Sequence, residues 1–345
     1  MSGVKRSACS SAELKTCWQA DITDHVIALA WSPGGTVLAA AAVSGPIVLF
    51  DGSTGKVRHY LPGHEFGTTA VGCSRDGVHF ASSGQDGKIR LWDQATGRER
   101  LALDGGAPWV EHLAWCPMDN LLATSAGRKL RLWDPQGRLV REYPQHSSTI
   151  ADIQWKPRSC ELASASYGCV SLWTPDRSEP LRRFEWKGSQ LVLAWSPDGK
   201  YLATGDQDCT VHFWIVRVGE DLQMSGYPRK VRELAWDHTS RFLATGGGDM
   251  PCVWDCSGKG PAGTTPTQLE GHEAAVSALA YQHAGPLLAS GGEDGLLAVW
   301  QPTKSSKPLA ASSQDSGLTC LAWSLDDKWL AAGMEDGRVA VFQRP

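Results

Sequence analysis

Short apolar segments separated by turn-forming residues follow one another along almost the whole chain. Residues 191–214 are typical: apolar 191–195, turn 196–199, apolar 201–205, polar hairpin 206–209, then the apolar stretch 210–214. Proline fixes φ at a turn position, and glycine allows positive φ there. Runs of four to six β-branched and aromatic residues between such turns are typical of strands. No window shows sustained helical periodicity, so the pattern predicts an all-β protein.

The strand pattern repeats. One position recurs at intervals of 40 to 45 residues, at Trp31, Cys73, Trp115, Trp155, Trp195, Trp236, Tyr281 and Trp323. A second follows each of these by 18 or 19 residues, at Phe50, Trp92, Trp133, Trp173, Trp214, Trp254, Trp300 and Phe342. Two such ladders in register predict eight repeats. Each repeat holds three strands, with a weaker fourth between repeats, for example at 57–60 or 139–143.

Two of the repeats carry a recognisable set of motifs. These are Gly63-His64, Asp86-Gly87 and Leu91-Trp92-Asp93 in the second repeat, and Gly271-His272, Asp294-Gly295 and Val299-Trp300 in the seventh. With this spacing, residues 13–345 resemble the WD-repeat family. Four-stranded sheets repeated at this interval are typical of propeller blades. The resemblance therefore implies an eight-bladed β-propeller with four antiparallel strands in each blade.

The ends of the chain predict how the ring closes. The last repeat ends at Phe342, too close to Pro345 for a fourth strand, whereas residues 13–19 precede the first repeat. Pairing this N-terminal segment with the last blade removes exposed sheet edges, which closed sheets avoid. We therefore expect a single propeller domain over 13–345, closed by the N-terminal strand. Residues 1–12 are expected to form a flexible lead.

The family resemblance also implies a buried hydrogen-bonded set of His, Ser or Thr, Asp and Trp in each complete blade. Two blades have all four, namely His64, Ser82, Asp86 and Trp92, and His272, Ser290, Asp294 and Trp300. The fourth repeat keeps His146, Ser164 and Trp173 but has no Asp. A hydrolytic triad needs one exposed copy with an oxyanion hole, whereas this set recurs. Its repetition favours a structural network.

The loops that enter the blades supply candidate binding residues. Trp186 and Tyr227 occupy the position of the buried His, where each either fills the slot or opens onto the surface as an anchor. The family places the loop before the first strand on the face near the pore, and Trp and Arg are common hot spots there. The predicted partner-binding residues are Trp109, Glu111, Trp186, Tyr227, Arg229 and Lys230. These predict a non-catalytic scaffold that binds a protein or peptide.

Charge and composition restrict the partners further. The 33 basic and 37 acidic residues give a net charge of −4. A general nucleic-acid or anionic-membrane binder would need a basic surplus. No run approaches the 18 apolar residues of a transmembrane helix. Residues 1–11 do not resemble a signal peptide, so we expect a cytoplasmic protein, monomeric on its own, with ten reduced cysteines.

An alternative is a protein that handles a small ligand or zinc. First-strand residues approach the channel of a propeller, so His112, Asp152 and Glu233 could act there with nearby thiols. Cys252 and Cys256 lie four residues apart on one strand, about 13 Å, too far to share one ion. The remaining cysteines are expected to be small buried hydrophobic residues, and Cys169 and Cys209, in neighbouring hairpins, are the one pair whose proximity needs checking. No nucleophile-elbow or phosphate-loop motif occurs, so we predict no catalytic residues, cofactor or bound metal.

Overall fold

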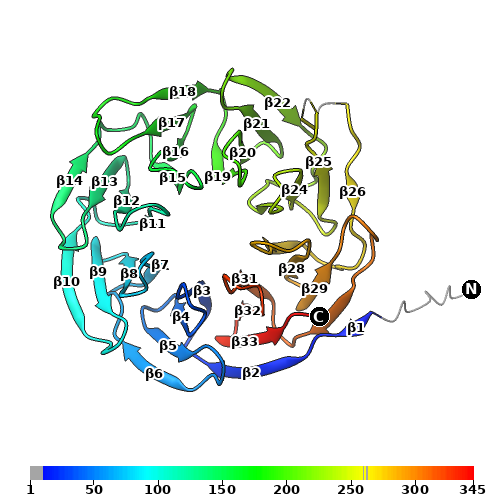
Figure 1. Cartoon of the computed structure of the whole chain (residues 1–345), viewed down its shortest axis with the longest axis horizontal. Helices are drawn as coiled ribbons and strands as arrows, with labels where there is room; N and C mark the ends of the chain where they lie inside the picture. The colour runs from blue at the N-terminus through cyan, green and yellow to red at the C-terminus, as the bar shows by residue number, and fades with distance from the viewer. Residues whose placement is uncertain (1–10, 259, 262) are drawn as a thin grey trace, which may run out of the picture.

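The computed structural model describes residues 11–258, 260–261 and 263–345. Within them, eight sheets stand around a central axis like the sectors of a wheel (Figure 1). The innermost strand of each sheet is, in order, β3 (Val26–Trp31), β7 (Thr68–Cys73), β11 (His112–Trp115), β15 (Ile150–Trp155), β19 (Gln190–Trp195), β23 (Leu234–Trp236), β27 (Val276–Tyr281) and β31 (Leu318–Trp323). The predicted eight-bladed propeller is confirmed, and we number the blades 1 to 8 in this order.

The second strand of each blade is sandwiched between its neighbours. These strands are β4 (Val37–Ala42), β8 (His79–Gly84), β12 (Leu122–Ala126), β16 (Leu162–Ser166), β20 (Tyr201–Asp206), β24 (Phe242–Thr245), β28 (Leu288–Gly292) and β32 (Trp329–Met334). Every residue of β4, β8 and β12 is buried. Their Ala, Ser and Gly side chains are small enough to let adjacent blades pack face to face, so the hydrophobic core lies between the blades.

The third and fourth strands complete each blade outward. The third strands are β5 (Ile47–Asp51), β9 (Lys88–Asp93), β13 (Lys129–Trp133), β17 (Cys169–Trp173), β21 (Val211–Ile215), β25 (Cys252–Asp255), β29 (Leu296–Trp300) and β33 (Arg338–Gln343). The outer strands of blades 1 to 7 are β6 (Val57–Leu61), β10 (Glu99–Asp104), β14 (Leu139–Glu142), β18 (Arg182–Glu185), β22 (Glu220–Met224), β26 (Thr267–Gln268) and β30 (Ala310–Ser313). Pairing within each of these blades is antiparallel, as expected.

The N-terminal segment supplies the outer strand of blade 8. Strand β2 (Thr16–Asp21) pairs antiparallel with β33, so the predicted ring closure is confirmed (Figure 1). A further contact was not predicted: the two-residue strand β1 (Ala12–Glu13) pairs in parallel with β30 of blade 7. The N-terminal segment thus joins two blades. Residues 1–10 of the expected lead lie outside the described residues.

Tryptophan side chains join neighbouring blades at the end of the innermost strand. In six blades the indole Nε1–H of the first ladder donates to a backbone carbonyl of the preceding blade, at 2.9 to 3.3 Å. Trp155, for example, donates to the Ala114 oxygen at 2.9 Å. Cys73 of blade 2 and Tyr281 of blade 7 stand at the same position and have no indole to donate. Two of the eight junctions therefore lack this bond.

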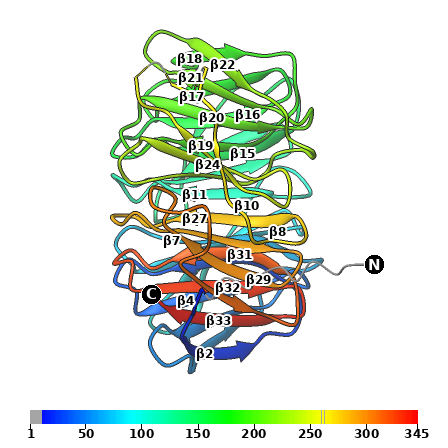
Figure 2. The ribbon, with the colours of Figure 1, turned by 90° about the vertical axis from the view of Figure 1, so that its right-hand side faces the viewer.

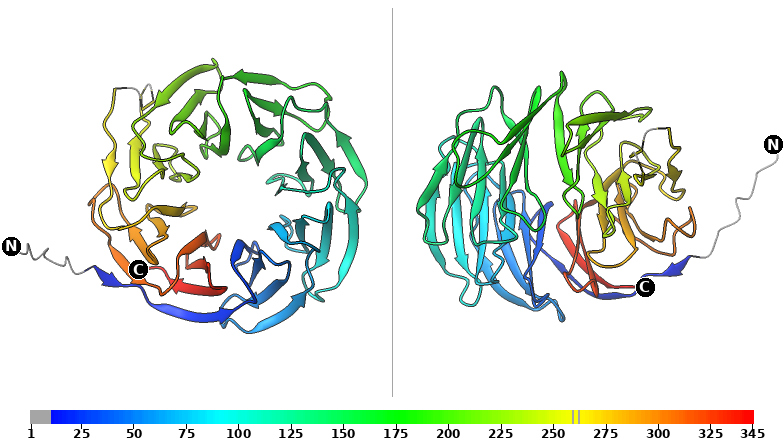
Figure 3. Two further views of the ribbon diagram at one scale, coloured as in Figure 1. Left: turned by 180° about the vertical axis from the view of Figure 1, so that it is seen from behind. Right: turned by 45° about the horizontal axis from the view of Figure 1, so that its top comes forward.

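The alternation of strands gives the disc two faces (Figures 2 and 3). The loops that enter the innermost strands and the hairpins between second and third strands share one face, which we call the loop face. The remaining turns form the opposite face. These connections leave buried strands, so a stable scaffold positions the loops of this face. This face is where the sequence places its candidate binding residues.

Candidate functional site

Blade 2 contains the complete hydrogen-bonded set. The Trp92 indole donates to the Ser82 hydroxyl at 2.8 Å, and the same hydroxyl lies 2.8 Å from Nε2 of His64. Nδ1 of His64 lies 2.8 Å from Asp86. Burial lowers the pKa of His64, although the Asp86 carboxylate opposes that shift. The arrangement is closed and satisfied, which suits a structural role.

Blade 7 repeats this geometry. Trp300 donates to Ser290 at 2.8 Å, His272 Nε2 lies 2.7 Å from the same hydroxyl, and its Nδ1 lies 3.1 Å from Asp294. Asp294 also accepts the backbone N–H of Glu273 at 2.7 Å. The network therefore connects the loop that enters the blade with the hairpin between its second and third strands.

In blade 6, Tyr227 fills the histidine position. Its hydroxyl lies 3.0 Å from Thr245 Oγ1 and accepts the Trp254 indole N–H at 3.0 Å. The phenol thus replaces the imidazole in the same chain of bonds. Of the two interpretations of Tyr227, this geometry supports the buried filler, because its polar end is already occupied.

In blade 5, Trp186 takes the same position and covers a second buried histidine. Its ring lies 3.8 Å from that of His212, at an angle of 35°. His212 and Asp206 are both 0% exposed, with Nε2 3.9 Å from the carboxylate. Burial raises the pKa of Asp206 to about 7 and lowers that of His212, so both groups are driven toward neutrality. Sequence reasoning missed this pair, because neither residue occupies a motif position.

Blade 4 has the chain of bonds but lacks its acidic end. Trp173 donates to Ser164 at 2.8 Å, and Ser164 lies 2.8 Å from Nε2 of His146. Nδ1 of His146 is buried and has no hydrogen-bond partner in the described part of the chain. Burial lowers the pKa of His146 to about 4. A neutral imidazole with one unused ring nitrogen therefore lies just below the loop face.

His146 gives a testable dependence of stability on pH. Its folded pKa of about 4 lies below the ordinary value of 6.5, so the folded state binds its proton more weakly. The stability contribution of this residue is complete above pH 6.5 and is lost as pH falls toward 4. When the pH is lowered from 7 to 5, we expect the unfolding free energy of the wild type to fall by about 2 kcal/mol more than that of the His146→Gln variant. Urea denaturation of both proteins at the two pH values measures this difference. An equal fall in the unfolding free energy of the two proteins would contradict the prediction.

The predicted binding residues that remain accessible lie on the loop face. Trp109 is 56% exposed, and Arg229 and Lys230 are exposed beside a groove of about 350 Å³ between blades 6 and 7. Arg229 lies 3.7 Å from Glu293 across this groove. Glu111 is partly buried, and its carboxylate accepts the Gly127 N–H at 3.0 Å. Trp109, Arg229 and Lys230 can thus meet a partner directly, whereas Glu111 holds a hairpin.

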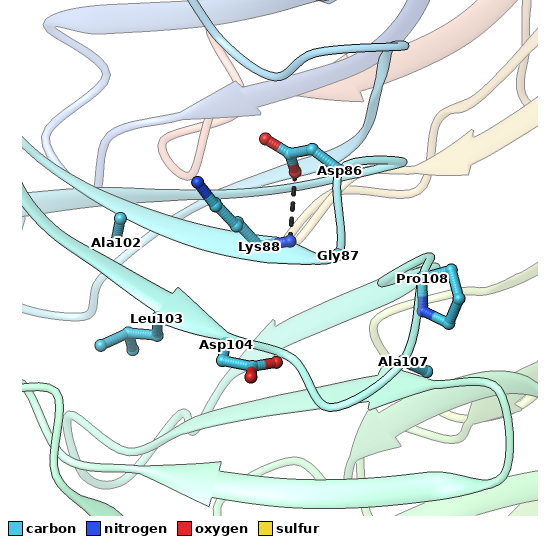
Figure 4. A pocket seen from close by; sticks show the side chains of 8 residues that line it. All are labelled: Asp86, Gly87, Lys88, Ala102, Leu103, Asp104, Ala107 and Pro108. Atoms are coloured by element: carbon cyan, nitrogen blue, oxygen red, sulfur yellow. Dashed lines mark hydrogen bonds between the residues drawn. The ribbon is translucent and has the colours of Figure 1, made fainter.

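A second groove is lined by Pro108, the residue before Trp109. It has a volume of about 440 Å³ and separates the hairpin of blade 2 from the loop that enters blade 3 (Figure 4). Asp86 and Lys88 line one wall, and Asp104 and Pro108 line the other (Figure 4). Trp109 follows Pro108 directly in the chain. The groove therefore has charged walls, and the exposed Trp109 belongs to the loop that forms one of them.

Sequence reasoning missed four exposed apolar side chains on the same face. Phe66 is 81% exposed and has a φ of 64°. Val43, Tyr167 and Met250 are also exposed, each in a hairpin between a second and a third strand. A positive φ is unusual for an aromatic residue. The signal available in the sequence was the placement of Phe66 two residues after His64, within a loop already assigned to this face.

The predicted channel residues are not grouped as a metal site. Both carboxylate oxygens of Asp152 accept backbone N–H groups at 2.7 Å, from Ile153 and from Leu193 of the next blade. Glu233 accepts the Gly247 N–H at 3.3 Å. The described residues contain no group of three or more His, Cys, Asp or Glu that could hold a metal ion. This geometry does not favour the small-ligand or zinc alternative, which included His112.

Two cysteines lie side by side that the sequence did not single out as a pair. The thiols of Cys116 and Cys160 are 3.5 Å apart. Cys169 contacts Ser171 of its own strand. Burial raises the pKa of Cys116 to about 11, which disfavours the thiolate. Reactive thiol chemistry is not indicated there.

The ring of four-stranded blades and its His–Ser–Trp networks define a repeat-built β-propeller. The profile described as "WD domain, G-beta repeat" matches residues 55–93, 99–134, 137–174, 179–214, 263–301 and 306–343. The chain therefore belongs to the WD40 family. The structure adds blades 1 and 6, whose three inner strands fall outside the matched segments.

Comparisons with known proteins agree with this assignment. The chain is 29% identical over 253 residues to "Cell division cycle 20.1, cofactor of APC complex" of Arabidopsis thaliana, covering 66% of this chain and 53% of that protein. It is 26% identical over 174 residues to "WD repeat-containing protein slp1" of Schizosaccharomyces pombe, covering 47% and 36%. "Echinoderm microtubule-associated protein-like 2" of Mus musculus is 25% identical over 253 residues, covering 70% and 36%. The chain thus spans about a third to a half of these relatives.

A solved structure confirms the architecture alone. The computationally designed Ika8 protein superposes with a TM-score of 0.81 at 23% identity, covering 97% of this chain and 100% of that one. At this level of identity the likeness concerns the fold. The described part of the chain contains no helix with the length and apolarity of a membrane span.

Proposed function

We propose that this protein is a non-catalytic scaffold that binds a peptide or protein partner on its loop face. The observation that carries the proposal is Trp109, which is 56% exposed and directly follows the groove residue Pro108 in the chain. The large indole offers contact area to a partner from a loop that a stable scaffold positions. Trp and Arg side chains in such positions often dominate binding energy. Arg229 and Lys230 add positive charge on the same face.

The relatives support binding as the mode of action. The Arabidopsis relative is named as a cofactor of a complex, and the mouse relative as a microtubule-associated protein. Both names describe proteins that act through other proteins. The net charge of −4 favours a protein partner over nucleic acid. We expect the cytoplasmic monomer to meet this partner through the loop face.

The proposal is tested by comparing two double variants in a quantitative pull-down. Trp109→Ala/Arg229→Glu alters the loop face, and Leu325→Ala/Arg98→Glu makes the same kinds of change at exposed positions in turns of the opposite face. We expect the first variant to capture about tenfold less partner than the wild type, or even less, because the loss of two hot-spot side chains costs more than about 1.4 kcal/mol of binding free energy. The second should retain them. Loss with the second variant alone would place binding on the opposite face and contradict the proposal.

A further inference from the structure

Blade 4 has a cavity where blades 2 and 7 have an aspartate. The cavity measures about 240 Å³ and is lined by His146, Ser166, Ser171, Trp173 and Arg183. Through Ser147, Cys169 and Arg183 it joins a larger open depression of about 800 Å³ on the loop face. Tyr167, Trp186 and Lys187 border that depression. The unused nitrogen of His146 thus lies beside a hollow that connects with the surface.

The cavity arises because one residue is missing from a hairpin. Ser82 and Trp92 of blade 2 are ten residues apart, as are Ser290 and Trp300 of blade 7, but Ser164 and Trp173 are nine apart. Aligned with Gln85-Asp86-Gly87 of blade 2, blade 4 reads Tyr167-Gly168, so the residue that is lost is the aspartate. The Trp–Ser–His chain is otherwise retained with the same distances.

Proton bookkeeping along this chain fixes the character of His146. An indole N–H can only donate, so Ser164 accepts from Trp173, and its second lone pair or its own proton faces Nε2 of His146. We assign to His146 the tautomer of blades 2 and 7, in which the serine proton goes to Nε2 and the ring proton sits on Nδ1. In blades 2 and 7 the equivalent nitrogen faces a carboxylate. In blade 4 it is a buried donor without an acceptor among the described residues, a state that costs about 1–3 kcal/mol.

One positively charged side chain, Arg183, lines the same cavity. Arg183 lies opposite Ser171 in the ladder and forms no ion pair with any residue that the structure describes. Ser171 stands where blade 2 has Arg90, which binds the Asp86 carboxylate at 3.2 Å. The guanidinium in blade 4 therefore comes from the outer strand instead. Lys187 and the acidic Glu185 both border only the outer depression, so Arg183 is the charged side chain that lines the cavity itself.

We propose that this cavity receives the carboxylate of an Asp or Glu side chain from a peptide partner. The carboxylate accepts the Nδ1–H of His146 and pairs with Arg183, replacing the aspartate that the hairpin lacks. The rings of Tyr167 and Trp186 border the adjoining depression, where neighbouring peptide residues can pack. This inference rests on the proposed function and specifies the chemistry of the partner.

A variant that supplies the missing carboxylate from within tests the site directly. Inserting one aspartate between Tyr167 and Gly168 restores the hairpin of blade 2, and inserting one alanine there gives the same length without an acceptor. We expect the aspartate insertion to have a higher melting temperature than the alanine insertion, because only the aspartate can accept the Nδ1–H of His146. Sodium acetate should shift the His146 resonances of ¹⁵N-histidine-labelled wild type saturably, and should leave those of the aspartate insertion unchanged. No saturable shift in the wild type would overturn the site.

Displayed peptides test the partner. Random peptides selected on the wild type should include acid-containing binders that lose about tenfold affinity with the aspartate insertion, with Arg183→Gln, or when their acid becomes the amide. Binders that respond to Trp109→Ala but not to these changes would overturn this inference and leave the proposed function standing. Binders that respond to neither set, or no binders at all, would overturn both. Displacement by sodium phosphate but not by acetate would assign the cavity to phosphate and reject the carboxylate.

Discussion

A chain that begins at residue 22 is expected to lose cooperative folding. Strand β2 supplies the whole outer edge of blade 8, and its removal leaves β33 with an unpaired edge. Leu14 and Trp18 are buried, and each such side chain contributes about 1.5–3 kcal/mol. With the lost ladder, the total approaches the roughly 5–15 kcal/mol that stabilises a typical domain. Thermal unfolding followed by circular dichroism should show no sharp transition.

A shorter truncation is the control for this experiment. Deleting residues 1–11 leaves β1, Leu14 and β2 in place, so its melting temperature should match that of the full chain. A synthetic peptide of residues 11–22, added in trans, should restore a transition to the longer truncation. A sharp transition at the wild-type temperature in the chain that begins at residue 22 would contradict the role given to β2.

Removing one buried tryptophan is expected to have the second-largest effect. Trp300 is 0% exposed and donates to Ser290 at 2.8 Å. Trp300→Ala opens a cavity and should lower the free energy of unfolding by about 3–5 kcal/mol. Asp294→Ala, which orphans His272 in the same network, should cost about 1–3 kcal/mol. Urea denaturation provides both values.

The matched control is a tryptophan that the structure places at the surface. Trp109→Ala removes the same atoms from an exposed position, and surface changes of this kind usually stay within about 0.5 kcal/mol. We therefore expect the loss of unfolding free energy to be largest for Trp300→Ala, smaller for Asp294→Ala and smallest for Trp109→Ala. A Trp300 variant as stable as the Trp109 variant would show that the network in blade 7 does not support the fold.

The fold could be predicted closely because the sequence repeats at a regular interval. Two ladders in register determine the number of blades, and a last repeat without a fourth strand indicates its closure. The contacts that could not be predicted join residues that no repeating sequence pattern marks. The parallel contact of Ala12–Glu13 with β30 involves two residues of no distinctive character. The carbonyl partners of the ladder tryptophans lie about 40 residues away and depend on how the blades pack.

The candidate site was only partly accessible to sequence reasoning. The ladder interval of 18 instead of 19 residues already marked blades 3, 4 and 6, but only the structure connects the shorter hairpin of blade 4 with a cavity beside His146. Loop residues such as Trp109 and Phe66 carry no periodic signal that separates exposed from buried rings. Exposure in a loop depends on φ values and on neighbours from adjacent blades, which no local pattern encodes.

The two junctions without an indole bond divide the ring unequally. Blades 2 to 6 form one continuous arc of tryptophan-linked sectors, and blades 7, 8 and 1 form the other. Other bonds cross the two remaining junctions: the Thr68 hydroxyl donates to the Gly45 carbonyl between blades 2 and 1, and the Val276 N–H donates to the Gly248 carbonyl at 2.9 Å between blades 7 and 6. The ring is therefore continuous, but its junctions are of two kinds. Trp109 and Arg229 both belong to the arc of blades 2 to 6, so every blade junction between them carries an indole bond.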